Sequence, residues 1–413
     1  MQRKNKFVLL LTLGLLTAIG PFSIDMYLPG FPDIATNLQT TVSKVSLSLS
    51  SFFIGISFGQ LLYGPMLDRF GRKKPLYIGL CLYLLASIGC AIASSVNALI
   101  IWRLFEALGG CVGMVAARAM VRDLFPVSEN AKVFSTLMLV VGVSPIIAPT
   151  LGGYLTASVG WRSVFIVLTL MAVGILTLVH FKLPESKKPD PHYSLKPKPI
   201  FMAFGKVLKE PQFYTYSLTG SMAAAGLYAY IAGSPYVFMQ LYKVSEKQYG
   251  WIFALIAAGL ITATQINTFL LKRFSSQQII RIALSFQVTA GLSLLLGSIY
   301  GWLGLYSTIF LLLMFLSCQG FTFPNSSALC MAPFSKNAGS ASALMGGIQM
   351  AIGASTSAIV SYLNNGTSIP MTATMFGCSA ASLCIFLAGK KIIDYKASLD
   401  QVEEQGAELI STT

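Results

Sequence analysis

Ionisable side chains are scarce in this chain. Charged residues make up only 11% of its 413 residues, and only two histidines occur, His180 and His192. The chain also lacks a G-x-x-x-x-G-K-[ST] segment, the backbone loop that cradles ATP phosphates. Without these groups we expect no zinc site, no histidine-based catalytic triad, no ATP-binding loop and no enzyme activity.

Cysteine pairs with metal-ligand or redox spacing are also missing. The seven cysteines all lie inside apolar runs, and none forms a C-x-x-C pair. This pattern is typical of buried free thiols that behave as small hydrophobes. We therefore predict no disulfide, no metal and no cofactor.

Long apolar runs are what the chain has in abundance. Hydrophobic residues make up 54%, and mean hydropathy is +0.69. Runs of about 18 or more apolar residues cross the hydrocarbon core as helices, whereas a membrane barrel would show shorter alternating segments. We predict an all-α polytopic membrane protein with twelve spans, at 7–31, 43–66, 76–95, 98–120, 131–157, 163–183, 211–238, 249–271, 278–299, 303–331, 338–363 and 370–389.

The net charge of +14 does not indicate nucleic-acid binding, because the bases lie in loops between apolar runs. With the N-terminus inside, 23 Lys and Arg fall in inner segments and four in outer loops. This asymmetry predicts that both termini are cytoplasmic. The first run has no A-x-A site, so we interpret it as an uncleaved span.

A lysine- and proline-rich break at 184–210 divides the spans into six and six. It predicts a six-helix bundle at 1–183, a semi-extended cytoplasmic linker, a second bundle at 211–390 and a disordered acidic tail at 391–413. A shift of 204 residues lays Met66–Phe70 on Leu270–Phe274 and Gly142 on Gly346. Such parallel repeats are common in secondary transporters.

Asp25, Arg103, Glu106 and Arg118 are the ionisable residues that we place inside the membrane. Each costs about 2.5–3.5 kcal/mol or more at the bilayer centre unless it is paired or hydrated. The similar estimated depths of Asp25, Arg103 and Glu106 indicate one polar site. Either a carboxylate there changes protonation as water access alternates, or the cluster only fixes packing; Arg118 either takes part or extends toward the interface.

Two further segments have unusual composition. The stretch Gly64–Lys74 places one acid and four bases within seven residues, which indicates a tight cationic loop between spans. Span 5 contains Gly142, Pro145, Pro149, Gly152 and Gly153. Prolines remove helical hydrogen bonds and glycines remove side-chain bulk, so this helix either acts as a hinge or only allows close packing.

These motifs together resemble the major facilitator superfamily. Gly64, Asp68, Arg69, Gly71 and Arg72 match its G-x-x-x-D-R-x-G-R loop, and Arg103 with Glu106 resembles its span-4 motif. Span 5 is similar to its antiporter motif, with Ala148 in place of a glycine. The segments Ser23–Pro29 and Arg122–Pro126 resemble the Bcr/CflA drug-resistance branch in particular.

This resemblance implies a monomeric drug:proton antiporter of the bacterial inner membrane, driven by the proton gradient. It implies export of small amphipathic compounds, proton transfer involving Arg103, and a loop that locks the outward-open form. Two alternatives remain open. One is a proton-coupled uptake symporter for a small metabolite on the same fold, and the other is a membrane enzyme or structural membrane protein.

Overall fold

The structure is a computed structural model that describes residues 3–190, 197–334 and 338–411. Within these ranges every regular element is a helix and no strand occurs, which confirms the predicted all-α class. Residues 191–196 of the predicted linker and 412–413 of the predicted tail lie outside the described residues.

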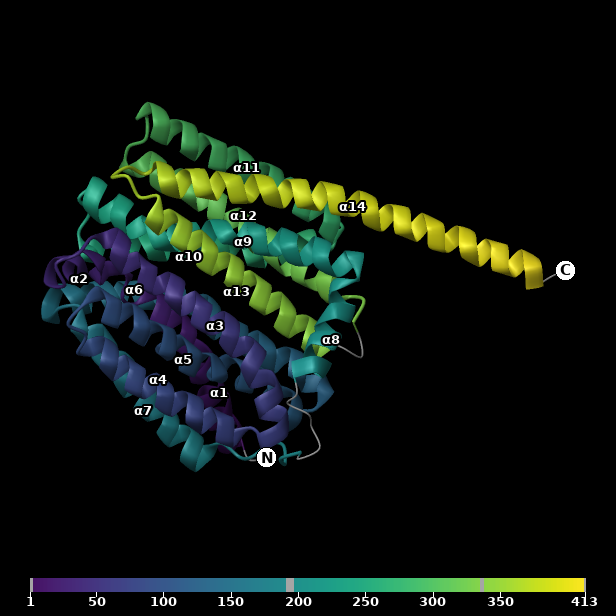
Figure 1. Ribbon diagram of the computed structural model, residues 1–413, viewed down its shortest axis with the longest axis horizontal. Coiled ribbons are helices and arrows are strands. Elements are labelled where there is room, and N and C mark those ends of the chain that lie inside the picture. The colour runs from purple at the N-terminus through teal and green to yellow at the C-terminus, as the bar shows by residue number, and fades with distance from the viewer. Residues whose placement is uncertain (1–2, 191–196, 335–337, 412–413) are drawn as a thin grey trace.

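The long helices form two six-helix bundles that lie side by side in Figure 1. The first bundle contains α1 (Arg3–Asp25), the 3₁₀ turn η1 (Leu28–Gly30), α2 (Phe31–Asn37), α3 (Val42–Phe70), α4 (Lys73–Ala91), α5 (Val96–Leu124), α6 (Val127–Val159) and α7 (Arg162–Lys182). After α8 (Pro197–Leu208), the second contains α9 (Pro211–Pro235), the π-helical turn η2 (Tyr236–Leu241), α10 (Glu246–Leu270), α11 (Ser276–Tyr300), α12 (Leu305–Met331), α13 (Ala338–Tyr362) and α14 (Ile369–Ser411).

Eleven of the described helical segments are long and apolar enough to cross a membrane. They correspond to all predicted spans except the seventh, which is α9. This helix carries many Ser, Thr and Tyr side chains but is buried along most of its length, against α12, α13 and α14. Because α9 is enclosed by protein, its composition need not match lipid.

The first predicted span is divided in the structure. α1 ends at Asp25, and η1 and α2 follow it closely. Pro29 has no backbone N–H to donate to the Asp25 carbonyl, so one helical hydrogen bond is missing where α1 ends. Asp25 therefore lies at a helix end and not in the middle of a span.

Two predictions about the connecting segments are wrong. The predicted semi-extended linker contains the helix α8, and Val207 of α8 is buried against Phe213 and Tyr216. The predicted disordered tail is a continuation of α14, which projects from the body in Figure 1. The residues after Lys390 contain no proline and many good helix formers, so the helix has no local reason to stop.

Two seams join the bundles. α3 packs along α13, and α6 packs along α10. We call the end of the molecule that carries Gly64–Lys74 the loop side, and the opposite end, with α2, the far side (Figure 1). On the far side the α3–α13 seam is closed by a hydrogen bond of 2.5 Å between the Ser46 and Ser361 hydroxyls.

Candidate functional site

Arg103 and Glu106 form a salt bridge that is sealed from solvent. They lie one turn apart in α5, the Arg103 Nη1 to Glu106 Oε2 distance is 2.6 Å, and both side chains are 0% exposed. Glu106 also accepts a hydrogen bond of 2.9 Å from the Ser87 hydroxyl of α4. The pair thus satisfies its charges within the first bundle.

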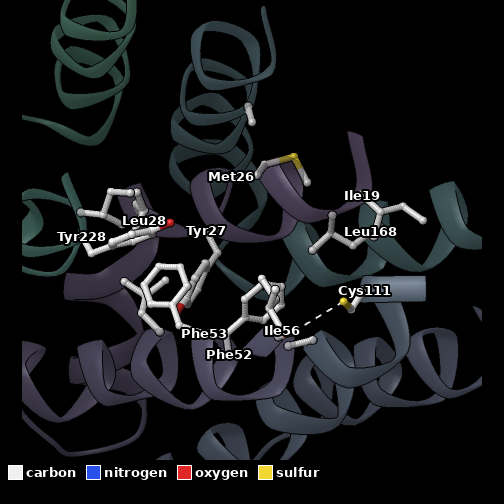
Figure 2. Close-up of a cluster of buried hydrophobic side chains, with 14 of the residues drawn as sticks. Ile19, Met26, Tyr27, Leu28, Phe52, Phe53, Ile56, Cys111, Leu168 and Tyr228 are labelled. Carbon is white, nitrogen blue, oxygen red and sulfur yellow. Dashed lines mark hydrogen bonds between the residues drawn. The ribbon is translucent and has the colours of Figure 1, made fainter. Parts of the chain in front are cut away.

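Aromatic rings replace water around the Arg103 guanidinium. Its central carbon lies 4.3 Å from the ring centroid of Tyr27 and 4.1 Å from that of Phe52. Figure 2 shows these two rings close together, Tyr27 from the turn after α1 and Phe52 from α3. Cation–π contacts of this kind are stronger when the cation is desolvated. Neither ring was identified from the sequence, because apolar runs contain many aromatic residues.

Arg103 also holds the end of α1. Its Nη2 donates a hydrogen bond of 2.8 Å to the backbone carbonyl of Ser23, in the last turn of that helix. Cations are favoured at helix C-termini, where carbonyl groups lack helical partners. Arg103 therefore positions the helix end that carries Asp25.

Asp25 is set apart from this ion pair. Its side chain is buried, with 4% exposure, yet it has no hydrogen-bond or salt-bridge partner among the described residues. The turn η1, which follows Asp25 after two intervening residues, contacts α9 and α10 of the second bundle. The structure thus brings Arg103 and Glu106 together, as expected, but does not join Asp25 to them through a direct bond.

The glycines of the antiporter-like segment explain why the end of α1 lies at the seam. A side chain at Gly152 would collide with the Met26 carbonyl of the first bundle. A side chain at Gly153 would lie 2.6 Å from the Glu246 carbonyl of the second bundle. These neighbouring glycines thus bring α6 into backbone contact with both bundles.

The other residues of this segment differ in their surroundings. The Pro149 carbonyl lies 2.8 Å from where a Gly250 side chain would begin, so Pro149 also belongs to the α6–α10 seam. Gly142 has ample space, because a methyl group added there would lie 4.0 Å from its nearest neighbour, the Ile261 side chain. Pro145 and Pro149 both lie inside α6, which runs as one helix from Val127 to Val159.

The loop Gly64–Lys74 is held by a network of charges. Arg72 donates from Nε to Asp123 at 2.8 Å and from Nη1 to Asp68 at 3.1 Å. Burial by itself lowers the pKa of Arg72, but Asp123 and Asp68 outweigh burial and the net pKa is raised. Arg72 thus stays cationic and links the ends of α3 and α5.

The remaining loop residues have distinct environments. Gly71 has a φ of +80°, a conformation that favours glycine. The Arg69 carbonyl accepts a hydrogen bond of 3.0 Å from the Asp190 backbone N–H. A methyl group added at Gly64 would have no neighbouring atom within 4 Å, so close packing does not account for a glycine at this position.

Arg118 faces a cavity on the loop side. The cavity has a volume of about 210 Å³ and is lined by α3, α5 and the start of α13, including Asp68, Arg118 and Gly339. Among described residues the Arg118 guanidinium has one hydrogen-bond contact, a distance of 3.5 Å to the Met114 sulfur. The described residues contain no cluster of three or more His, Cys, Asp or Glu suited to a metal ion.

The comparisons with known proteins agree with this architecture. The model of the Major Facilitator Superfamily matches residues 13–358. The chain belongs to the major facilitator superfamily. It is therefore a multi-pass membrane transporter and not an enzyme, which confirms the resemblance drawn from the motifs.

Individual relatives cover nearly the whole chain. The chain is 30% identical to a bicyclomycin resistance protein homolog of Haemophilus influenzae, over 93% of this chain and 96% of that protein. It is 28% identical to multidrug resistance protein D of Escherichia coli, over 91% of this chain and 95% of that protein. A solved structure of a bacterial homolog of the human lysosomal transporter Spinster superposes with a TM-score of 0.70 at 15% identity. The match covers 94% of this chain and 96% of that chain.

Proposed function

We propose that this protein exports small amphipathic drugs in exchange for protons, across a bacterial inner membrane and with both termini in the cytoplasm. The names of its relatives support drugs as substrates. The observation that carries proton coupling is Asp25, a buried carboxyl group without a protein partner among the described residues, at the junction of the two bundles.

The chemistry of Asp25 fits a group that loads and releases a proton. An unpaired carboxylate inside a protein is costly, and binding a proton removes that cost. When the bundles separate and water reaches the seam, the anion is hydrated and the cost disappears. Alternating access therefore changes the proton affinity of Asp25, which is the requirement for coupling.

The other predicted site residues take different roles in this proposal. Arg103 and Glu106 are sealed from solvent, so neither carries the proton; Arg103 positions the end of α1, and Glu106 balances its charge. Arg118 lines the drug's path on the loop side, where it faces the cavity. The domains move as two units, 1–183 and 211–390.

The test is transport by purified protein in vesicles with an imposed pH gradient. We expect Asp25→Asn to abolish gradient-driven movement of a phenicol antibiotic or ethidium while the protein still inserts. Asp394→Asn, which neutralises an exposed carboxylate of α14, is the matched control and keeps wild-type transport. Coupled transport by Asp25→Asn would exclude Asp25 as the coupling group.

The direction of transport distinguishes export from the uptake alternative. An exporter lowers the drug content of energised whole cells, and collapse of the proton gradient restores it. Accumulation of a substrate that is lost on collapsing the gradient would instead identify an uptake symporter.

A further inference from the structure

The first residues after α7 lie against the gating loop, which we define as Gly64–Lys74. The Glu185 carboxylate accepts hydrogen bonds from the backbone N–H groups of Arg72, at 2.7 Å, and Lys73, at 3.1 Å. These donors begin α4, whose first N–H groups have no helical partners. Glu185 therefore caps α4 from a position 113 residues further along the chain than Arg72.

The next residues bind the charged network of the same loop. The Ser186 hydroxyl donates a hydrogen bond of 2.8 Å to Asp123. The Lys187 Nζ lies 2.7 Å from Asp68 Oδ1, and these side chains are 40% and 31% exposed. Asp68 thus has two cationic partners, Arg72 from its own loop and Lys187 from the linker.

The start of α13 lies across the loop-side cavity from Asp68. Asp68 lines this cavity together with Gly339 and Ser342, among the first residues of α13. The N-terminus of a helix attracts a carboxylate, because its free N–H groups and its dipole are positive. No hydrogen bond or salt bridge joins Asp68 to α13 among the described residues. If Asp68 moved across the cavity to the start of α13, its carboxylate would leave Lys187.

We propose that Lys187 is a positioning residue of the gate, holding Asp68 away from α13 and thereby favouring the form in which the loop-side cavity is open. Glu185 fixes the linker to the gating loop through its hydrogen bonds with the Arg72 and Lys73 backbone, so that Lys187 reaches Asp68. The linker is then part of the gate as well as a connection between bundles. The use of this gate in transport rests on the proposed function, whereas the conformational effect does not.

The experiment measures the separation of the bundles on the loop side in the full-length protein without substrate. Spin labels are attached through unnatural amino acids at positions 74 and 272, which are exposed residues, one in each bundle. The variant is Lys187→Met, and the matched control is Lys188→Met, which removes the same charge from the exposed neighbouring residue. Lys187→Gln tests a polar replacement, and Lys187→Arg restores the charge.

We expect Lys187→Met and Lys187→Gln to raise the ratio of short to long label distances about two- to fivefold, the range that a partly exposed ion pair supplies. Lys188→Met and Lys187→Arg keep the wild-type ratio. In an Asp68→Asn background Lys187→Met has no further effect, because its partner charge is already absent.

Equal distance distributions for Lys187→Met and Lys188→Met would overturn the proposal. So would an effect of Lys187→Met that persists with Asp68→Asn. Because the distances are measured without a gradient or a drug, failure of proton-coupled export would leave this result unchanged. The two proposals can therefore fail separately.

Discussion

Arg103 keeps its charge inside the first bundle because several contacts together replace its hydration. Glu106 supplies the opposite charge, the Ser23 carbonyl accepts a hydrogen bond, and Tyr27 and Phe52 cover the guanidinium. Removal of either Arg103 or Glu106 leaves the other charge buried without a counter-ion. Buried pairs of this kind cost much when one member is removed and little when both are replaced by apolar groups.

This asymmetry gives a prediction for Glu106. Glu106→Ala leaves Arg103 as an unpaired buried cation and should lower the free energy of unfolding by about 3–5 kcal/mol. The double variant Arg103→Met with Glu106→Met should recover most of that loss but not transport, because the bond to Ser23 is absent. Thermal unfolding in detergent and vesicle transport measure the two effects, with Ser158→Ala on the exposed end of α6 as a control. A double variant as unstable as Glu106→Ala would contradict this account.

At the scale of the element, α6 is organised by its glycines. Gly152 contacts the end of α1 near Asp25, and Gly153 contacts the start of α10 across the seam. A single turn of α6 therefore contacts both the end of α1, which carries Asp25, and the start of α10 in the second bundle. This placement gives the antiporter-like motif a steric role that its composition alone left open.

The glycines of α6 supply their own matched control. Gly152→Ala and Gly153→Ala place a methyl group against backbone atoms, so each should cost about 1–3 kcal/mol through overpacking. Gly142→Ala meets open space and should be neutral or slightly stabilising, because alanine is the better helix former. The measurement compares the unfolding free energies and the transport rates of the three variants. Equal effects at 142 and 152 would show that the close approach of α6 to α1 does not matter.

At the scale of the whole molecule, the two ends of the α3–α13 seam differ. Toward the far side, Ser46 bonds Ser361 and Ser50 bonds Ser357 at 3.0 Å, whereas the loop side holds a cavity lined by both helices. The structure is thus closed on the far side. The proposed export requires this side to open, so these serine pairs must then separate during the transport cycle.

A reversible cross-link tests that requirement. In Ser46→Cys with Ser361→Cys the two sulfur atoms replace hydroxyls 2.5 Å apart, well placed for a disulfide. Oxidation should abolish transport, and reduction should restore it. Each single variant, treated with the same oxidant, controls for the native cysteines. Full transport by the oxidised double variant, with the disulfide confirmed by mass, would exclude separation at this point.

The sequence predicted the helical class and the positions of eleven apolar spans, but several local features depended on packing. α9 differs from the other spans because protein surrounds it, and α14 continues because nothing in its sequence stops it. The pairing of Arg103 with Glu106 follows from helical spacing, whereas the isolation of Asp25 depends on where α1 ends. The contacts of Glu185 and Lys187 with the gating loop join residues more than a hundred positions apart, so no local pattern indicates them.

The sequence by itself determined the membrane location, the family and the identity of the residues that carry charge into the bilayer. Long apolar runs have no other stable environment, and the motifs depend on residue type and spacing alone. The tertiary structure decided which of those charges are paired. Arg103 and Glu106 neutralise each other inside one bundle, while Asp25 lies at a helix end whose following turn contacts the second bundle, and that difference depends on long-range packing.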